Sequence, residues 1–504
     1  MGSLIKVFLL CCATLEIYGA GQKNVKPLVT TKYGQLLGKT VDVKGTDRSV
    51  HAFMGVPFAK PPTGPLRYAE PQPPEPWSSV KEATAPPPMC LQNPIIMEHS
   101  VTIFKANAVL PPILEDCLYL NIFTPADREK NSKLPVMVFI HGGGLAIGYA
   151  SLYDGSALSA YENIVMVSIQ YRLGPLGFFS TGDKEVQANL GLLDQVAAFQ
   201  WVQENIKEFG GDPQSVTIFG ESAGGLSVSA HILSPLSKGL FHRAIAESGV
   251  AIFPNLMVHQ TEDVLYGRDL IANISECDLP LILNCLKNKT EDEMLEITVA
   301  MGFTILPVCV DGIFLPKPAE EILAAKESNP VPYMEVQGAH VDTISQYQWN
   351  DGWNGEDRRS VSTKFFSIDS GLPVYFYEFQ HRPSLYDDSK ADFVKADHGD
   401  ELYFVLGGPF LNGDVTFQGD GTDEEKVLSK KIMKYWANFA RYGDPNGPGL
   451  TEWLKYDEDE HYMELNLKQK MSQRLKEERF KFWTNTLPET TKEMREKRDD
   501  HTEL

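Results

Sequence analysis

The residues with the clearest chemical pattern are Gly220-Glu221-Ser222-Ala223-Gly224, a serine held between two glycines. The apolar run 216–219 precedes them, and a segment rich in Ala, Ser and Leu follows to about Leu233. A strand, a sharp turn and a helix in this order expose a nucleophilic serine in many hydrolases. Glycines tolerate the strained backbone that such a turn requires. We therefore predict that Ser222 is a nucleophile for acyl transfer, and the alternative is an ordinary glycine-rich turn.

A second glycine-rich segment, His141-Gly142-Gly143-Gly144, follows the apolar run 136–140, about eighty residues upstream of Ser222. Acyl transfer needs N–H donors that stabilise the oxyanion of the tetrahedral intermediate. We predict that these donors are Gly143, Gly144 and Ala223, the last because a helix N-terminus favours negative charge. A glycine-rich hairpin is the alternative, and we expect His141 to be structural.

The base should be a histidine that follows Ser222, because hydrolases with this turn carry Ser, acid and His in that order. His398 lies in a polar segment, 395–401, with a glycine and acids after it, which favours an exposed and orientable imidazole. Two other histidines are set aside because they fall in the helix after the turn and in the C-terminal tail: His231 and His501. Two remain competitors on the sequence alone: His381 and His461.

Strand and helix patterns alternate around these residues, which indicates a mostly parallel central sheet flanked by helices. We expect buried strands at 136–140, 164–169 and 216–219, and a strand with alternating aromatics at 374–379. Apolar residues at helical spacing predict a helix that stops at the Gly-Gly-Asp-Pro segment 210–213: Val196, Phe199, Val202, Ile206 and Phe209. No internal repeat divides the 504 residues, so we predict one α/β domain over 22–504.

The charge balance argues against nucleic acid as a partner. The chain has 46 basic and 67 acidic residues, a net charge of −21. An acidic surface keeps a protein in solution and repels phosphate backbones. Hydrophobic residues make up 43% of the chain and charged ones 22%, which fits a globular protein with a substantial core.

Both ends of the chain carry targeting patterns. Residues 1–21 are typical of a signal peptide, with Lys6 before the apolar run 7–13 and small residues at 19–21, although a buried strand is the alternative. The C-terminus, His501-Thr502-Glu503-Leu504, is close to the KDEL and HDEL retrieval signals. No other stretch approaches the ~18 apolar residues of a membrane span. We predict residence in the endoplasmic reticulum lumen, with a retrieval receptor as a partner and no transmembrane segment.

The five cysteines outside the signal peptide fit an oxidising compartment. Cys90 and Cys117 flank a proline-containing stretch with the pattern of a loop, and Cys277 and Cys285 bracket a short helical one. Two bridges with Cys309 as an odd thiol are expected, and five free buried thiols are the alternative. Two sequons predict N-glycosylation, at Asn273-Ile274-Ser275 and Asn288-Lys289-Thr290.

Several long stretches resemble the type-B carboxylesterase family, most closely its vertebrate members retained in the endoplasmic reticulum. Besides the two glycine-rich segments, the matching stretches are 53–59 (FMGVPFA), 115–121 (EDCLYLN), 396–402 (ADHGDEL) and 435–441 (YWANFAR). Together with the tail, they cover about residues 25–334 and 371–504.

The resemblance implies an α/β-hydrolase fold and a serine esterase without cofactor or metal. Ser222 would form the acyl-enzyme, His398 would be the base, and the oxyanion hole would be the one predicted above. The implied disulfides are Cys90–Cys117 and Cys277–Cys285. The implied substrates are hydrophobic esters, thioesters and amides, including drugs and lipids.

The segment 335–370 departs from the family. Relatives continue the strand that resembles 331–334 into a turn that carries the acid of the triad, a glutamate, and then into a long helical region. Here the sequence differs after Met334, the chain is shorter by tens of residues, and the expected place of the glutamate falls near Val341. Asp342 is a weak substitute, because it is displaced by one residue and is one methylene shorter. We therefore expect a carboxylic-ester hydrolase that is impaired and less stable than its relatives.

Two other interpretations remain. One is a non-catalytic relative that serves as a binding or adhesion protein, or an inactive variant; the presence of Ser222 argues against it, and the missing acid argues for it. The other is a peptidase or lipase on the same fold, which would differ mainly in the acyl pocket.

Overall fold

The computed structural model describes residues 26–182, 186–251, 257–258, 261–338 and 371–477. The predicted signal peptide, the C-terminal tetrapeptide and Asp342 lie outside these ranges. Within them, no helix has both the length and the apolar character needed to cross a membrane.

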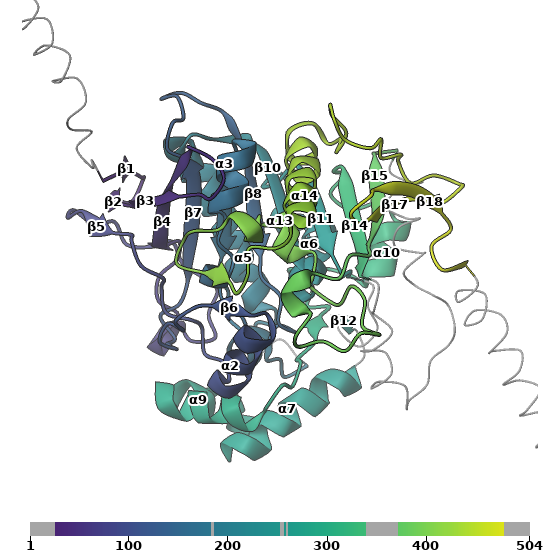
Figure 1. Cartoon of the computed structure of the whole chain (residues 1–504). Helices are drawn as coiled ribbons and strands as arrows, with labels where there is room; N and C mark the ends of the chain where they lie inside the picture. Colours follow the sequence, from purple (N-terminus) through teal and green to yellow (C-terminus); the bar gives the residue numbers. More distant parts are fainter. Residues whose placement is uncertain (1–25, 183–185, 252–256, 259–260, 339–370, 478–504) are drawn as a thin grey trace, which may run out of the picture.

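The described chain is organised around one sheet of eleven strands (Figure 1). In spatial order these are β18 (Lys470–Gln473), β17 (His461–Leu465), β15 (Val374–Phe379), β14 (Tyr333–Gly338), β11 (Arg243–Glu247), β10 (Gly211–Glu221), β8 (Leu134–Ile140), β9 (Val165–Ile169), β7 (Tyr119–Pro125), β4 (Ser49–Pro57) and β3 (Lys39–Asp42). The six neighbouring pairs from β9 to β17 are parallel, and the four pairs at the two edges are antiparallel. This is the α/β-hydrolase arrangement, and the prediction of a mostly parallel sheet is confirmed.

Three small sheets and the helices complete the described structure. The small sheets join β1 (Leu28–Thr30), β2 (Gln35–Leu37) and β5 (Lys81–Glu82); β12 (Met257–Val258) and β13 (Val308–Cys309); and β16 (Thr416–Phe417) and β6 (Ala106–Asn107). The α-helices are α2 (Pro94–Ile103), α3 (Ser156–Glu162), α4 (Gly174–Phe178), α5 (Leu190–Asn205), α6 (Ala223–Leu233), α7 (Thr261–Ser275), α8 (Ile282–Asn288), α9 (Glu291–Ala300), α10 (Ala319–Ala324), α13 (Leu402–Val405) and α14 (Asp423–Tyr442).

Helices cover both faces of the central strands, which explains why these strands are continuously apolar. All residues of β8 and β9 are buried. Val138 on β8 belongs to the same apolar cluster as Phe199 of α5. Its neighbour Phe139 belongs to the cluster on the other face, with Trp436 of α14. Successive side chains of a strand point to opposite faces, so an uninterrupted apolar run fills two cores.

The predicted strands and helices are present. The expected strands correspond to β8, β9, β10 and β15, and the helix after the serine ends at Leu233 as predicted. The periodic helix is α5, whose last turn tightens into a 3-10 segment, Ile206–Phe209, before Gly210 stops it at φ 85°. The strand β10 begins at Gly211, earlier than expected.

One local prediction was wrong. The stretch between Cys90 and Cys117 contains α2 and is not simply a loop. Asn93 caps this helix by accepting hydrogen bonds from the N–H groups of Ile95 and Ile96, and Pro94 occupies the first helical position. Asn followed by Pro is a helix-start signal, since proline lacks an N–H that would be unpaired there in any case.

The disulfides Cys90–Cys117 and Cys277–Cys285 are both formed, and Cys309 is a free, buried thiol. These pairings confirm the bridges that the family resemblance implied.

The sheet continues past Met334, the residue after which the sequence is expected to depart from the family. The strand β14 extends four residues beyond Met334, to Gly338. It pairs with β11 on one side and with β15 on the other, in parallel register from Tyr333↔Val374 to Gly338↔Phe379. The segment 335–370 that is expected to differ from relatives therefore begins inside the sheet.

Candidate functional site

Ser222 lies at a strained turn between β10 and α6. Its backbone has φ 59° and ψ −120°, a conformation that is costly for a residue with a side chain. A Cβ at Gly220 would lie 2.5 Å from the carbonyl oxygen of Ile140, and one at Gly224 would lie 2.0 Å from the same atom. Only glycine fits at these two positions. The N–H of Ser222 donates to the carbonyl of Glu247 at 2.8 Å, which anchors the turn to β11.

The glycines after β8 lie directly against this serine. A Cβ at Gly142 would be 3.0 Å from Cβ of Ser222. Gly143 and Gly144 have φ 103° and 64°, which turn the backbone into a conformation that side chains disfavour. Among the described residues, no hydrogen bond uses the N–H of Gly143, Gly144 or Ala223. Three donors are therefore available around Ser222, where an oxyanion would form.

His141 supports this loop. Its ring stacks on Tyr171 with 4.5 Å between centroids, and Nδ1 donates to the carbonyl oxygen of Gly142 at 2.9 Å. Tyr171 in turn donates its hydroxyl hydrogen to the carbonyl of His141 at 2.8 Å. Burial lowers the pKa of His141 to about 4, so the imidazole is neutral at physiological pH. These contacts agree with the structural role expected for it.

Three of the other histidines are held by partners away from Ser222. His231 is fully buried in α6 between Gln195 and Ser237, and burial lowers its pKa to about 3. The remaining two, on separate elements, form short contacts with acids: His381 with Glu425 at 2.9 Å and His461 with Asp457 at 2.8 Å. His398 is the histidine that the fold brings to the serine turn, where Nε2 lies 3.0 Å from Oε1 of Glu221.

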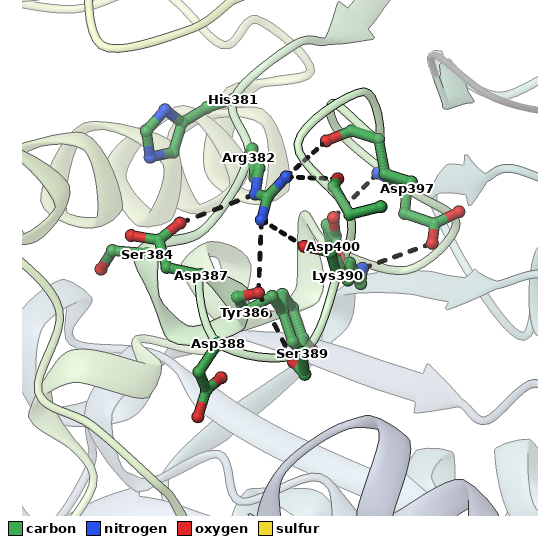
Figure 2. A network of polar contacts seen from close by, with 12 residues as sticks. His381, Arg382, Ser384, Tyr386, Asp387, Asp388, Ser389, Lys390, Asp397 and Asp400 are labelled. Carbon is green, nitrogen blue, oxygen red and sulfur yellow. Dashed lines mark hydrogen bonds and ion pairs between the residues drawn. The ribbon is translucent and has the colours of Figure 1, made fainter.

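A single arginine braces the loop that carries His398 (Figure 2). Arg382 points into this loop, and its guanidinium donates hydrogen bonds to four backbone carbonyls: those of Ala391 (2.7 Å), Lys390 (2.8 Å), Val394 (3.0 Å) and Tyr386 (3.4 Å). A planar guanidinium with five N–H groups is suited to such a set of acceptors, whereas an ammonium is not.

Lys390 ties the two ends of the same loop together (Figure 2). Its ammonium lies 2.7 Å from Asp400 and 3.4 Å from Asp397, and 4.0 Å above the ring of Tyr386. Asp397 accepts a hydrogen bond from the N–H of His398 at 2.9 Å. Thus the residues on both sides of the imidazole are fixed by charge and hydrogen bonding.

Three buried glutamates that were not predicted from the sequence to belong to the site surround the turn: Glu221, Glu247 and Glu401. Glu247 accepts a hydrogen bond from the indole of Trp436 at 2.7 Å. Burial, followed by the charges of Glu401 and Glu221, raises the pKa of Glu247 well above its usual range. Burial and then Glu221 also raise the pKa of Glu401. The sequence feature that could have identified two of them is their position, because Glu221 and Glu401 lie within the motifs that contain Ser222 and His398.

The structure does not join the serine to the histidine. Among the described residues, no hydrogen bond links Oγ of Ser222 with the imidazole of His398. Nε2 of His398 faces Glu221 instead, at an ion-pair distance but without the geometry of a hydrogen bond. The fold therefore assembles the serine turn, the three N–H donors and the histidine at one place, with the imidazole directed at a carboxylate.

Comparisons with known proteins agree with this geometry. The chain matches the Carboxylesterase family over residues 25–357 and 357–483. It is 44% identical to a cocaine esterase of Oryctolagus cuniculus, with 96% of this chain and 100% of that protein covered. It is 44% identical to the medium-chain fatty acyl-CoA hydrolase precursor of Anas platyrhynchos, with 98% of each covered. It is 45% identical to the pyrethroid hydrolase Ces2e of Rattus norvegicus, with 96% and 94% covered.

The length of one alignment also shows that this chain lacks residues that the relative has. The alignment with the rabbit protein runs over 546 positions but uses 96% of 504 residues, about 484, so roughly 60 aligned positions have no counterpart in this chain. The two matched family segments meet at residue 357, inside the segment 335–370 that is expected to depart from the family, although the family model still matches residues 335–357.

The turn geometry predicts that Ser222 is the residue that reacts with a fluorophosphonate. Only an activated serine that faces an oxyanion hole reacts quickly with such a probe. We expect Ser222→Ala to fold with an unchanged thermal midpoint and to take up no label, measured by gel fluorescence and by mass spectrometry of the modified peptide. Labelling that survives the substitution would remove Ser222 from this role.

The four hydrogen bonds from Arg382 to the loop that carries His398 predict that Arg382→Lys slows catalysis without weakening substrate binding. Lysine keeps the charge but cannot serve four carbonyls, so His398 should lose its fixed position. A misplacement of ~1 Å can cost about 10²-fold in rate, and we expect a fall in kcat of about 10–100-fold with KM nearly unchanged.

The matched control is Arg48→Lys. Arg48 donates to Asp127, Asn163 and the carbonyl of Ala160, away from His398. This variant should lose stability but retain kcat. Equal effects of the two substitutions on kcat would contradict a specific role for Arg382.

Proposed function

The chain belongs to the carboxylesterase family, and on that basis we propose that it cleaves carboxylic esters with Ser222 as nucleophile, His398 as base and the N–H groups of Gly143, Gly144 and Ala223 as oxyanion donors. Membership makes the protein a serine carboxylic-ester hydrolase. The observation that best supports these residue roles is the contact between the glycine loop and the strained serine turn, with three N–H groups unused around it.

The reaction follows from the positions of these groups. Oγ of Ser222 attacks the ester carbonyl carbon while His398 accepts the hydroxyl proton. The carbonyl oxygen becomes an oxyanion, which the three N–H donors stabilise. The tetrahedral intermediate collapses, the alcohol leaves with the proton from His398, and the acyl group remains on Ser222. Water, deprotonated by His398, then releases the carboxylic acid and restores the serine.

We propose hydrophobic esters and thioesters, and amides of similar character, as substrates. The relatives named above hydrolyse cocaine, fatty acyl-CoA and pyrethroids, as their names state. In this chain, Phe303 and Ile305 lie beside the proposed oxyanion donors, since a Cβ at Gly144 would be 3.0 Å from the first side chain and 3.2 Å from the second. Apolar side chains next to the reacting carbonyl favour apolar acyl groups.

A non-catalytic binding protein is the alternative. The strained backbone at Ser222 argues against it, because a turn of this kind costs about 1–3 kcal/mol and serves to present the serine. We further propose that this form turns over esters more slowly than relatives that keep the triad glutamate, since the acid fixes the histidine tautomer and stabilises the imidazolium.

We propose that the protein resides in the endoplasmic reticulum lumen and is glycosylated there. The two disulfides fit an oxidising compartment, and the side chains of Asn273 and Asn288 are exposed. The signals at the two ends, residues 1–21 and 501–504, are the basis for entry and for recognition by a retrieval receptor.

Restoring the family's glutamate-bearing segment in place of residues 335–370 should raise ester turnover. Loss of a triad acid costs about 10⁴ in rate in a serine protease, so we expect a gain of up to that size. The thermal midpoint should rise as well, because the restored helices would cover apolar surface worth about 25 cal/mol per Å². Equal turnover in the two forms would mean that the missing segment does not limit catalysis.

Asp342→Asn, assayed alongside, tests the one acid near the expected place of the glutamate. We expect turnover to change little, since the aspartate is shorter and displaced. Loss of activity in this variant alone would identify Asp342 as the acid of the triad.

Retention should depend on a free C-terminus at Leu504. Deletion of residues 501–504, or a short tag added after them, should send glycosylated protein into the medium, as measured by immunoblots of cells and medium. A tag of the same length placed directly after the predicted signal peptide is the control. Folded, truncated protein that stays in the cell would contradict retrieval by the tail.

A further inference from the structure

One carboxylate lies within ion-pair distance of His398 in the described part of the chain, and it is that of Glu221. Oε1 of Glu221 is 3.0 Å from Nε2, and the glutamate side chain is 5% exposed. Glu221 is the last residue of β10, so its backbone is fixed by the sheet and by the serine turn that follows. This carboxylate belongs to the rigid frame of the site.

We propose that Glu221 is the acid that positions His398 in this chain, in place of the glutamate that relatives carry after the strand corresponding to β14. The inference rests on the proposed function, because it assigns a partner to the proposed base. It extends that function by naming the residue on which the remaining catalysis depends.

The other two buried glutamates are less suited to this role. Glu247 is fully buried and holds the indole of Trp436, and Glu401 accepts a hydrogen bond from Ser248 at 3.4 Å. Three carboxylates in one buried cluster repel one another, so some of them take up protons. Burial and this repulsion raise the pKa of both Glu247 and Glu401. Glu221 is the member of the cluster that faces the cation.

The contact also sets which imidazole nitrogen can act. In a Ser-His-acid triad, one ring nitrogen faces the acid and the other takes the serine proton. Here Nε2 faces Glu221. In this arrangement the proton from Oγ of Ser222 would have to go to Nδ1, once the imidazole approaches the serine. No partner of Nδ1 is found among the residues that the structure describes. The proton would pass from Oγ to Nδ1, while the negative charge of Glu221 stabilises the imidazolium.

The same contact restrains the base at neutral pH. Burial lowers the pKa of His398, but the charge of Glu221, with smaller contributions from Glu401 and Asp397, outweighs it and raises the pKa to about 9. A base must be neutral to accept a proton, so activity should rise with pH through this value. At pH 7, two units below it, only about one imidazole in a hundred would be neutral. Glu221 would therefore orient His398 and also hold it in the charged form.

The test is the rate at which a fluorophosphonate labels Ser222 in the purified full chain, measured from about pH 6 to about pH 10. For the wild type we expect a single rise with its midpoint at about 9. Glu221→Gln removes the charge but keeps an oxygen, so the midpoint should fall by about one unit or more and the alkaline plateau should fall about 10-fold or more. Glu221→Ala also removes the oxygen, and its plateau should be lower still.

Glu401→Gln is the matched control, because it removes a carboxyl from the same cluster but not the one facing Nε2. Its midpoint should shift less than that of Glu221→Gln, and its plateau should fall less. An effect of Glu401→Gln as large as that of Glu221→Gln would overturn the assignment. The assignment would also be overturned if Glu221→Gln left the midpoint at its wild-type value. It would likewise be overturned if Asp342→Asn abolished the alkaline plateau of the labelling rate while Glu221→Ala did not.

These outcomes are separable from failure of the proposed function, which would appear as no labelling of wild-type Ser222 at any pH. If the Glu221 variants do not fold, the test is a pH titration of the His398 imidazole in the wild-type chain, followed by NMR with ¹⁵N-labelled histidines. A His398 imidazole that titrates at about 9 supports the proposal, and one that titrates near the unperturbed value of about 6.5 overturns it.

Discussion

The close approach of one backbone carbonyl to two glycines is the constraint on which the rest of the site depends. The carbonyl oxygen of Ile140, at the end of β8, occupies the space that a Cβ of Gly220 or Gly224 would need. This contact presses the serine turn onto the neighbouring strand and brings the glycine loop that continues β8 against Ser222. The proposed nucleophile and the proposed oxyanion donors are therefore positioned by a single packing contact between adjacent parallel strands.

The histidine reaches the same place by a different kind of support. Its loop has little regular secondary structure and is held by Arg382 and Lys390 through backbone carbonyls and carboxylates. Buried charge then determines its direction. Among the three buried glutamates, Glu221 is the one within ion-pair distance of the imidazole, and its charge raises the pKa of His398. One half of the site is thus fixed by steric contact and the other half by electrostatics.

This division explains what could be predicted from the sequence. The serine turn and the strands β8, β9 and β10 have local signatures, namely glycines at fixed offsets and continuous apolar runs, and the structure contains them. The helix α2 was missed although Asn93 and Pro94 form a local cap, so that error lay in the interpretation of the sequence. The contact between Glu221 and His398 is of another kind, because it joins residues 177 positions apart through a loop whose shape depends on Arg382. No residue spacing in the sequence predicts that the imidazole of His398 faces Glu221.

The pairing of β14 has an evolutionary consequence. Pairing with β11 as far as Val336 and with β15 as far as Gly338 fixes its register from both sides, and its last four residues belong to the segment expected to depart from the family. The connection that follows, which lies outside the described residues, can therefore change length while the hydrogen-bonding pattern of the sheet is kept. A lineage can in this way vary the chemistry of the enzyme while the strand order of the scaffold is kept.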